Sequence, residues 1–169
     1  NTGGPIAGHY EVNADGAGVS FGVHLADVEV DPETGKVDLL RYTTFQDAGL
    51  AVNPAQVEGQ MQGGATQGIG WALSEGYDYD EDGRLQNATL LDYRLPTSMD
   101  VPFIDTEIIE IPSEAHPLGI RAVGQAPIVP PAGAIANAIY NAVGVRMRQL
   151  PMKPETVYLA IRDSESQQA

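Results

Sequence analysis

The stretch NPAQVEGQMQGGATQGIGWALSE, residues 53–75, constrains the fold more than any other part of the sequence. Asn53 followed by Pro54 is typical of a helix start, because Asn caps free backbone N–H groups and Pro suits the first helical turn. The pattern predicts a helix over residues 54–75. Its apolar residues recur at intervals of four and predict a stripe facing a core: Val57, Met61, Ala65, Ile69 and Leu73.

The rest of this predicted helix is rich in glycine and glutamine. Each glycine costs about 1 kcal/mol relative to Ala in a helix interior; they are Gly59, Gly63, Gly64, Gly68 and Gly70. At about 100° per residue, one narrow face carries Gln56, Gln60, Gly63 and Gln67. Two interpretations stay open: a close packing contact with solvated glutamines, or a backbone that lets a flat ligand approach while the amides bind its edges.

The segments on either side predict strands. Apolar alternation over residues 19–30 changes phase, which predicts a strand with a bulge or bend near Leu25. The sequence Asp-Pro-Glu-Thr-Gly at 31–35 predicts a turn, and residues 37–45 its partner strand. Residues 105–111 predict a further strand, and an acidic turn at 80–83 joins two extended pieces.

Two more helices are expected, over residues 132–143, ended by Gly144, and over residues 154–162. We expect one domain over residues 1–163 and a polar, frayed tail at 164–169. Strands and helices occur in mixed order without a βαβ rhythm, so the predicted fold class is α+β, with mixed strands around a glycine-rich helix.

Composition excludes several functions. The 169 residues carry 23 acidic and 9 basic side chains, a formal net charge of -14, which disfavours nucleic acid and anionic membrane surfaces as partners. Because the chain has no cysteine, an iron–sulfur cluster would have to reside on another chain or segment. The chain starts at Asn1 rather than Met, and we expect a fragment or a processed subunit.

Familiar metal and catalytic motifs are absent from the sequence. Asp78, Asp80 and Asp82 before Gly83 mimic the opening of a calcium loop, but Thr89 stands where the bidentate Glu is required. The three histidines, His9, His24 and His116, have no metal-ligand spacing, so no metal site of protein side chains is expected. No activated serine, P-loop or dinucleotide fingerprint is found.

Residues 117–131, PLGIRAVGQAPIVPP, contain two glycines, four prolines and one charged residue. Such a segment is stiff and has free backbone donors, which suits a preorganised binding loop. An ordinary crossover before the helix at 132–143 is the alternative on composition alone.

Taken together, several motifs resemble the molybdenum hydroxylases, the family of xanthine dehydrogenase, aldehyde oxidoreductase and carbon monoxide dehydrogenase. The motifs are residues 53–70, DYRLPT at 92–97, RAVGQ at 121–125, ANA at 136–138 and LP at 150–151. The match is to the C-terminal part of the molybdopterin-binding large subunit and spans nearly the whole chain in order.

The resemblance implies a cofactor pocket. Gln60 corresponds to the family glutamine that hydrogen-bonds the pterin, and the same pocket is shaped by Gly63, Gly64 and Gln67. It further implies that a loop passes beside the cofactor, mainly through backbone groups, at Arg121, Ala122, Val123 and Gly124. The implied cofactor is molybdenum-molybdopterin, as the cytosine dinucleotide, with iron–sulfur clusters and FAD on other chains.

One position departs from the family pattern. The family loop ends in Val-Gly-Glu, where the glutamate acts as general base, whereas this chain has Gln125. An amide has no accessible proton-accepting pKa, so Gln125 cannot act as a base but can orient a substrate. An inactive or specialised relative, an engineered substitution and a substrate with its own base all stay open.

The function implied by the resemblance is part of a cytoplasmic molybdenum oxidoreductase. It would oxidise an aldehyde or N-heterocycle with oxygen derived from water. Its partners would be the remaining molybdopterin-binding sequence, an iron–sulfur subunit, an FAD subunit and a small-molecule substrate. Two alternatives remain: a non-catalytic cofactor-binding or assembly subunit, as Gln125 allows, and an α+β domain whose glycine-rich helix serves packing alone.

Overall fold

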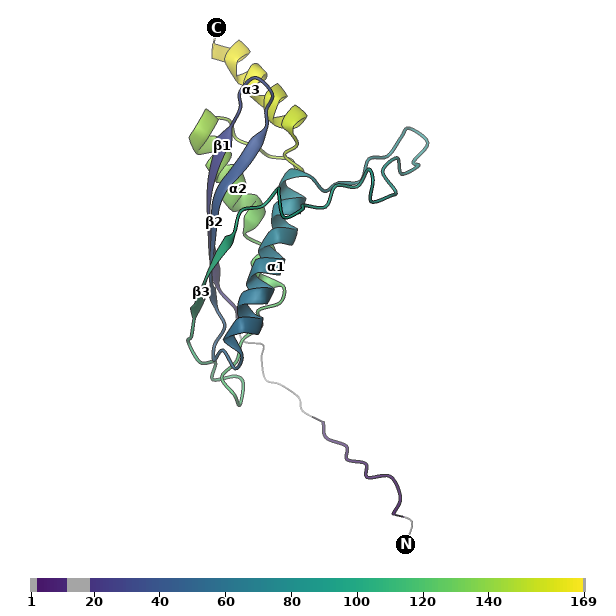
Figure 1. Ribbon diagram of the computed structural model, residues 1–169, viewed down its shortest axis with the longest axis vertical. Coiled ribbons are helices and arrows are strands. Elements are labelled where there is room, and N and C mark those ends of the chain that lie inside the picture. Colours follow the sequence, from purple (N-terminus) through teal and green to yellow (C-terminus); the bar gives the residue numbers. More distant parts are fainter. Residues whose placement is uncertain (1–2, 12–18, 169) are drawn as a thin grey trace.

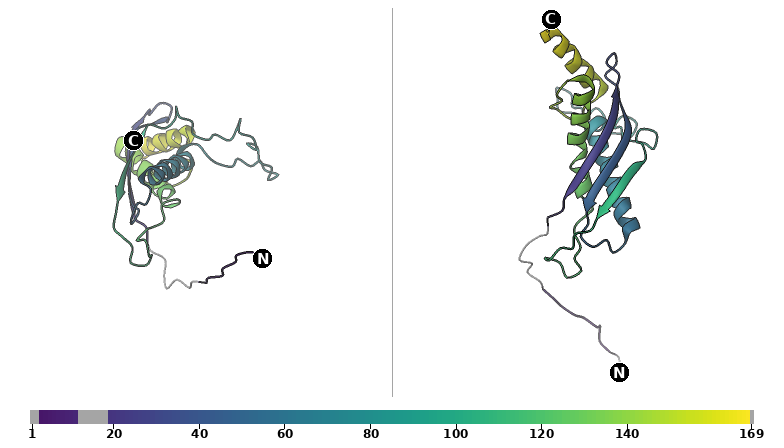
Figure 2. Two further views of the ribbon diagram at one scale, coloured as in Figure 1. Left: turned by 60° about the horizontal axis from the view of Figure 1, so that its bottom comes forward. Right: turned by 90° about the vertical axis from the view of Figure 1, so that its left-hand side faces the viewer.

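The computed structural model describes residues 3–11 and 19–168. Along the chain lie β1 (Gly22–Val30), β2 (Val37–Asp47), α1 (Pro54–Leu73), β3 (Ile104–Ile109), the short 3-10 helix η1 (Ala126–Ile128), α2 (Pro131–Val143) and α3 (Pro154–Gln168). The strands form one sheet in the order β1-β2-β3. Helices α1 and α2 pack on one face of this sheet (Figures 1 and 2), which confirms the α+β class.

The hairpin of β1 and β2 forms as predicted. Gly35 closes its turn with a φ of 72°, in the left-handed region that glycine tolerates. The Asp31 carboxylate accepts hydrogen bonds from the Glu33 backbone N–H at 2.9 Å and the Thr34 hydroxyl at 2.7 Å. A local side-chain network therefore fixes the turn.

The bulge expected near Leu25 is wrong in place and in cause. The register shifts between Asp27 and Val28, where β2 carries Leu40 as one residue without a partner on β1. The change of phase in the sequence arises because β1 is apolar on both faces. Its outward side chains Phe21, Val23 and Leu25 are exposed, whereas those that point toward the helices, such as His24, are more buried.

One crossover connection was not predicted from the sequence. Strands β2 and β3 pair in parallel with α1 between them, so the chain contains a strand-helix-strand unit after all. Residues 74–103, which extend away from the body in Figure 1, separate α1 from β3 and hide that rhythm in the sequence. Within this segment, Tyr79 and Leu85 pair across the predicted acidic turn.

The hydrophobic core lies between the sheet and the two helices. Met61, Ala65 and Ile69 of α1 are buried, which confirms the predicted inward stripe of this helix. Ile135 and Ile139 of α2 are also buried. Helix α2 ends at Gly144, with a φ of 73°, as predicted.

The predicted end of the last helix is wrong. Helix α3 continues to Gln168, through the segment expected to fray, while Ala169 lies outside the described residues. Arg162 pairs with Glu165 one turn later at 3.0 Å, and such pairs support an exposed helix. Among the described residues, no helix is both long and apolar enough to cross a membrane. Asn1, Thr2 and residues 12–18 of the expected 1–163 domain also lie outside the described residues.

Candidate functional site

The start of α1 is fixed by its cap. Asn53 has an extended backbone, and its side-chain oxygen accepts a hydrogen bond from the Gln56 backbone N–H at 3.2 Å. Pro54 occupies the first turn. Both features match the prediction, and they set the direction in which the glutamines leave the helix.

The glycines of α1 fall into two groups. A methyl group added to Gly64 would lie 2.9 Å from Cβ of Pro127, and one added to Gly68 would lie 2.6 Å from Cγ of Pro131. Gly70 is likewise closed off, by Glu75 and Pro96. For Gly64 and Gly68 the packing interpretation is confirmed, because η1 and the start of α2 approach the bare helix backbone, whereas Gly70 packs against the segment that follows α1. Gly64, a predicted cofactor-binding residue, lies on this packed side.

The second group is open. A methyl group added to Gly59 or Gly63 would meet no atom within 4 Å. The side chains of Gln56, Gln60 and Gln67 are exposed. We call the surface of Gln56, Gln60, Gly63 and Gln67 the open face of α1. Its glycine is explained by no packing contact within the described residues.

The loop at residues 121–125 lies beside the open face. A methyl group on Gly124 would stand 3.4 Å from the Oε1 atom of Gln60, so this loop lies next to α1 although the two residues are 64 positions apart in sequence. Ala122, Gly124 and Gln125 are exposed, and Val123 is half-buried. The structure therefore brings together the two segments that the sequence singled out separately.

The base of this loop is tied to the segment after β2. The Arg121 backbone N–H donates to the Ala48 carbonyl at 2.9 Å, and the Leu50 N–H donates to the Gly119 carbonyl at 2.9 Å. Gly49 and Ile120 form a bridge, with Gly49 at a φ of 66°. These bonds anchor the base of the loop, and the carbonyl of Gln125 at its end accepts from the Ile128 N–H in η1 at 3.3 Å.

Two residues at the end of β2 were missed in the sequence. The Gln46 amide donates to the Ala122 carbonyl at 3.2 Å, and the Asp47 carboxylate pairs with Nε of Arg121 at 2.9 Å. Their only sequence signal is that two polar residues end an otherwise alternating strand. Their partners lie more than seventy residues away, so no local pattern could have identified them.

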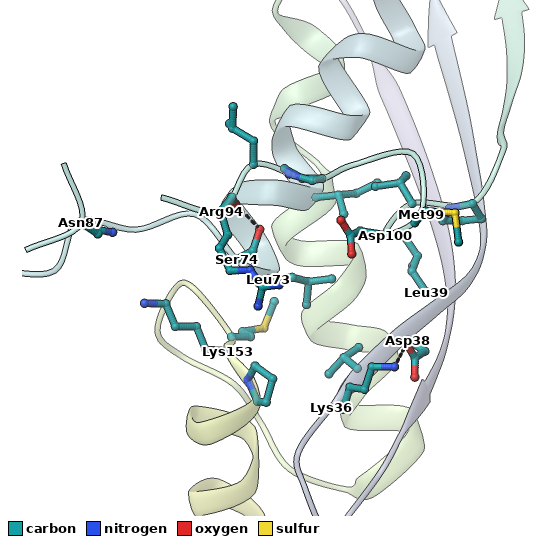
Figure 3. A pocket seen from close by; sticks show the side chains of 18 of the residues that line it. Lys36, Asp38, Leu39, Leu73, Ser74, Asn87, Arg94, Met99, Asp100 and Lys153 are labelled. Atoms are coloured by element: carbon teal, nitrogen blue, oxygen red, sulfur yellow. Dashed lines mark hydrogen bonds and ion pairs between the residues drawn. The ribbon is translucent and has the colours of Figure 1, made fainter. Parts of the chain in front are cut away.

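A cavity of about 630 Å³ lies elsewhere, at the C-terminal end of α1 (Figure 3). Two of its basic side chains have acidic neighbours: Lys36 pairs with Asp38 at 2.7 Å, and Lys153 with Asp78 at 3.2 Å, while Arg94 also lines the cavity. The cavity contains none of the predicted site residues.

Of the three histidines, His24 is a core residue. Its ring nitrogens lie 2.8 Å from the Tyr42 hydroxyl and 2.8 Å from the Thr44 hydroxyl, one donating and the other accepting. Burial lowers the pKa of His24 to about 4, which keeps the ring neutral, and burial also raises the pKa of Tyr42. In residues 3–11 and 19–168, no group of three His, Cys, Asp or Glu side chains is arranged to hold a metal ion.

The open face and the loop suit a flat heterocycle. Each glutamine amide both donates and accepts hydrogen bonds, and the exposed loop backbone at Ala122 and Gly124 adds further polar groups. The open backbone at Gly63 leaves room for a ring close to the helix. The donors and acceptors present therefore fit a pterin, which is planar and polar at its edges.

Comparison with known proteins gives matches over most of the chain. A family model described as a molybdopterin cofactor-binding domain matches residues 5–102. The chain is 38% identical over 141 residues to the gamma subunit of the 6-hydroxypseudooxynicotine dehydrogenase complex of Paenarthrobacter nicotinovorans. It is 39% identical over 140 residues to a putative xanthine dehydrogenase molybdenum-binding subunit of Escherichia coli K12.

A solved structure agrees with these relatives. The quinoline 2-oxidoreductase of Pseudomonas putida 86 matches with a TM-score of 0.78 and 34% identity, over 83% of this chain and 18% of that one. The two relatives above are matched over 82% of this chain but only 18% and 19% of their own lengths. The chain thus spans about a fifth of the proteins that it resembles.

Proposed function

The chain belongs to the molybdenum hydroxylase family, and on that premise we propose that it is a pterin-holding part of a molybdopterin-binding large subunit. The observation that carries the proposal is the approach of Gly124 to the amide of Gln60. This approach places the exposed loop beside the open face of α1, and within the described residues no packing contact explains the glycine of that face.

In this proposal the chain's residues bind and orient the cofactor. Gln60 and Gln67 hydrogen-bond the edges of the pterin and Gly63 leaves space for its ring, whereas Gly64 acts indirectly, by letting Pro127 pack against the helix. The side chain of Arg121 pairs with Asp47 and so is not available to the cofactor. The backbone of residues 122–124 therefore faces the cofactor. When bound, the molybdenum of the cofactor supplies the redox chemistry of hydroxylation.

Gln125 decides whether the site is catalytic. Its side chain is exposed at the end of the loop, where it can orient a substrate but cannot accept a proton. We expect Gln125→Glu to raise turnover of an aldehyde or N-heterocycle by about a hundredfold or more, the usual worth of a general base. An unchanged rate in a molybdenum-replete preparation would favour the alternative, a non-catalytic cofactor-binding or assembly subunit.

The finer features of the whole protein stay predictions. These are an aldehyde or N-heterocyclic substrate, the cytosine dinucleotide form of the pterin, a cytoplasmic location, and iron–sulfur and FAD subunits as partners. The names of the relatives support this direction, since they include subunits of a 6-hydroxypseudooxynicotine dehydrogenase and a xanthine dehydrogenase.

The pterin content of the assembled protein tests the proposal. Pterin released by acid and oxidised to its fluorescent form is measured per chain in wild type and in Gln60→Met. Gln62→Met is the matched control, because Gln62 bonds the Ile104 carbonyl at 3.3 Å and so faces β3 rather than the open face. We expect loss of pterin in Gln60→Met alone, whereas equal retention in both variants contradicts the proposal.

A further inference from the structure

We propose that Gln46 and Asp47 are positioning residues that hold the 121–125 loop in place for the cofactor. The inference rests on the proposed function for the identity of that ligand. The positioning itself depends only on contacts within this chain. Both residues lie at the end of β2, and each bonds a different group of the loop.

Asp47 is the more highly connected of the two. One carboxylate oxygen accepts from the backbone N–H groups of Gly49 at 2.9 Å and Ile111 at 3.2 Å. The other pairs with Nε of Arg121 at 2.9 Å, with the two side chains only 6% and 15% exposed. The Asp47 carboxylate thus joins three separate segments. Because it is buried, dissolved salt weakens its ion pair with Arg121 only slightly.

Arg121 extends this connection. Besides pairing with Asp47, it donates to the Val19 carbonyl at 2.6 Å and to the Ile111 carbonyl at 3.2 Å. The guanidinium is therefore held by oxygens from several directions and cannot swing out without breaking all of these bonds. Its backbone is fixed by the same arrangement, one residue before the exposed part of the loop.

Gln46 holds the next residue from the other side of the strand. Successive side chains of a strand point to opposite faces, so Gln46 and Asp47 reach the loop from the two faces of β2. The amide of Gln46 donates to the Ala122 carbonyl at 3.2 Å and to the Ser20 hydroxyl at 3.3 Å. With the Ala122 carbonyl turned inward, the loop keeps its remaining backbone groups for a ligand.

The other atom of this amide supports a positioning role. Gln46 is 1% exposed, and its Oε1 is buried without a hydrogen-bond partner among the described residues. A buried acceptor without a partner is unfavourable, and a purely apolar side chain would avoid that cost. A glutamine at this position is explained by what its donor does, which is to hold the Ala122 carbonyl.

Hydrogen exchange of the assembled protein tests this proposal. The variants are Gln46→Met, which removes the donor at similar length, and Asp47→Asn, which keeps an acceptor for Gly49 and Ile111 but removes the charge. Gln62→Met is the matched glutamine control. Asp27→Asn is the matched ion-pair control, because Asp27 pairs with Arg41 at the same 2.9 Å but is 55% exposed.

We expect the hydrogen-bonded backbone amides at the base of the loop, those of Leu50 and Arg121, to exchange about tenfold faster in both test variants, with no change in the controls or in α2. Unchanged exchange of the loop in Gln46→Met and Asp47→Asn overturns the proposal. If Asp47→Asn accelerates exchange in α2 as well, it has unfolded the protein, and Gln46→Met alone decides. Pterin content measured on the same samples separates the two ideas: a loosened loop in a protein that never held pterin contradicts the proposed function and not the positioning.

Discussion

The two sides of α1 use the same residue type for opposite purposes. On one side, Gly64 and Gly68 let Pro127 and Pro131 approach the helix backbone so closely that no methyl group would fit. On the other side, Gly63 meets nothing within 4 Å and lies among exposed glutamines. The first side is packed against other parts of this chain, whereas the glycine of the second side has no packing contact within the described residues.

This difference shows that a glycine-rich helix cannot be interpreted as a single unit. Each glycine lowers helix stability by about 1 kcal/mol relative to Ala, so each needs a compensating contact. The packed glycines, Gly64 and Gly68, make this compensating contact with η1 and α2. We infer that the open glycines make their compensating contact with a ligand. The following predictions test the two sides of α1 separately.

The largest expected effect is a loss of stability at low pH. It arises in the core beneath the packed side, where α2 contacts both β1 and α1. His24 of β1 has a pKa lowered from 6.5 to about 4 by burial. The unfolded chain therefore binds more protons than the folded one between these values, and stability falls as the pH drops from 6.5 to about 4. The loss reaches about 3 kcal/mol, since one pKa unit corresponds to about 1.4 kcal/mol.

Denaturant unfolding of wild type and His24→Leu between pH 4 and 7 checks this effect. Carboxyl groups titrate in the same range, so the difference between the two profiles isolates His24. His9→Gln serves as the control for removal of a histidine, because His9 is exposed and precedes β1. A difference that does not vary with pH would refute the role of His24.

Gly68→Ala should be the next largest effect. The new methyl group would lie 2.6 Å from Cγ of Pro131 and 2.7 Å from the Ile128 carbonyl oxygen, neither of which moves easily. Overpacking should exceed the gain in helix propensity and destabilise the protein by about 2 kcal/mol. Urea unfolding gives the value, and an unchanged or raised midpoint would mean that the packed side is looser than described.

Asn53→Ala should weaken both sides equally. The cap bond from the Gln56 N–H is lost, which costs about 1 kcal/mol of stability. Because the cap orients the first turn, which carries Gln56 of the open face, pterin content should fall together with helix stability. Thermal unfolding and pterin fluorescence on the same sample measure both, and a stability change below the error would show that the cap is not formed in solution.

Gly63→Ala should have the smallest effect and the opposite sign. The added methyl group meets no atom within 4 Å, so the helix gains about 0.5 to 1 kcal/mol from its higher propensity. Urea unfolding of Gly63→Ala beside Gly68→Ala compares the two sides directly. Destabilisation by both variants would remove the distinction between an open and a packed side.

Local signals predicted much of this fold. The cap at Asn53, the inward stripe through Met61 and Ile69, and the turn at Gly35 all depend on residues close in sequence. The end of α3 was predicted too early because short-range pairs such as Arg162 with Glu165 support helix in a polar segment. The position of the bulge depends on the pairing of β1 with β2, which apolar alternation alone does not set.

The candidate site was predicted only in part. Its two segments were identified from composition and resemblance, and the contact of Gly124 with Gln60 joins them. Which glycines pack and which stay open depends on where Pro127 and Pro131 lie in space, and sequence periodicity carries no such information. The grip of Gln46 on Ala122 joins residues 76 apart and was missed for the same reason.

The molybdenum content of Gly63→Leu beside wild type, measured per chain by elemental mass spectrometry of the assembled protein, tests the central claim most directly. Leucine is a good helix former and its Cβ would meet no atom within 4 Å at this exposed position, so the variant should fold as stably as wild type. If the open face of α1 holds the cofactor, wild type carries near-stoichiometric molybdenum and Gly63→Leu loses it by about tenfold or more. Equal molybdenum in both proteins, or none in a fully assembled wild type, would contradict the account.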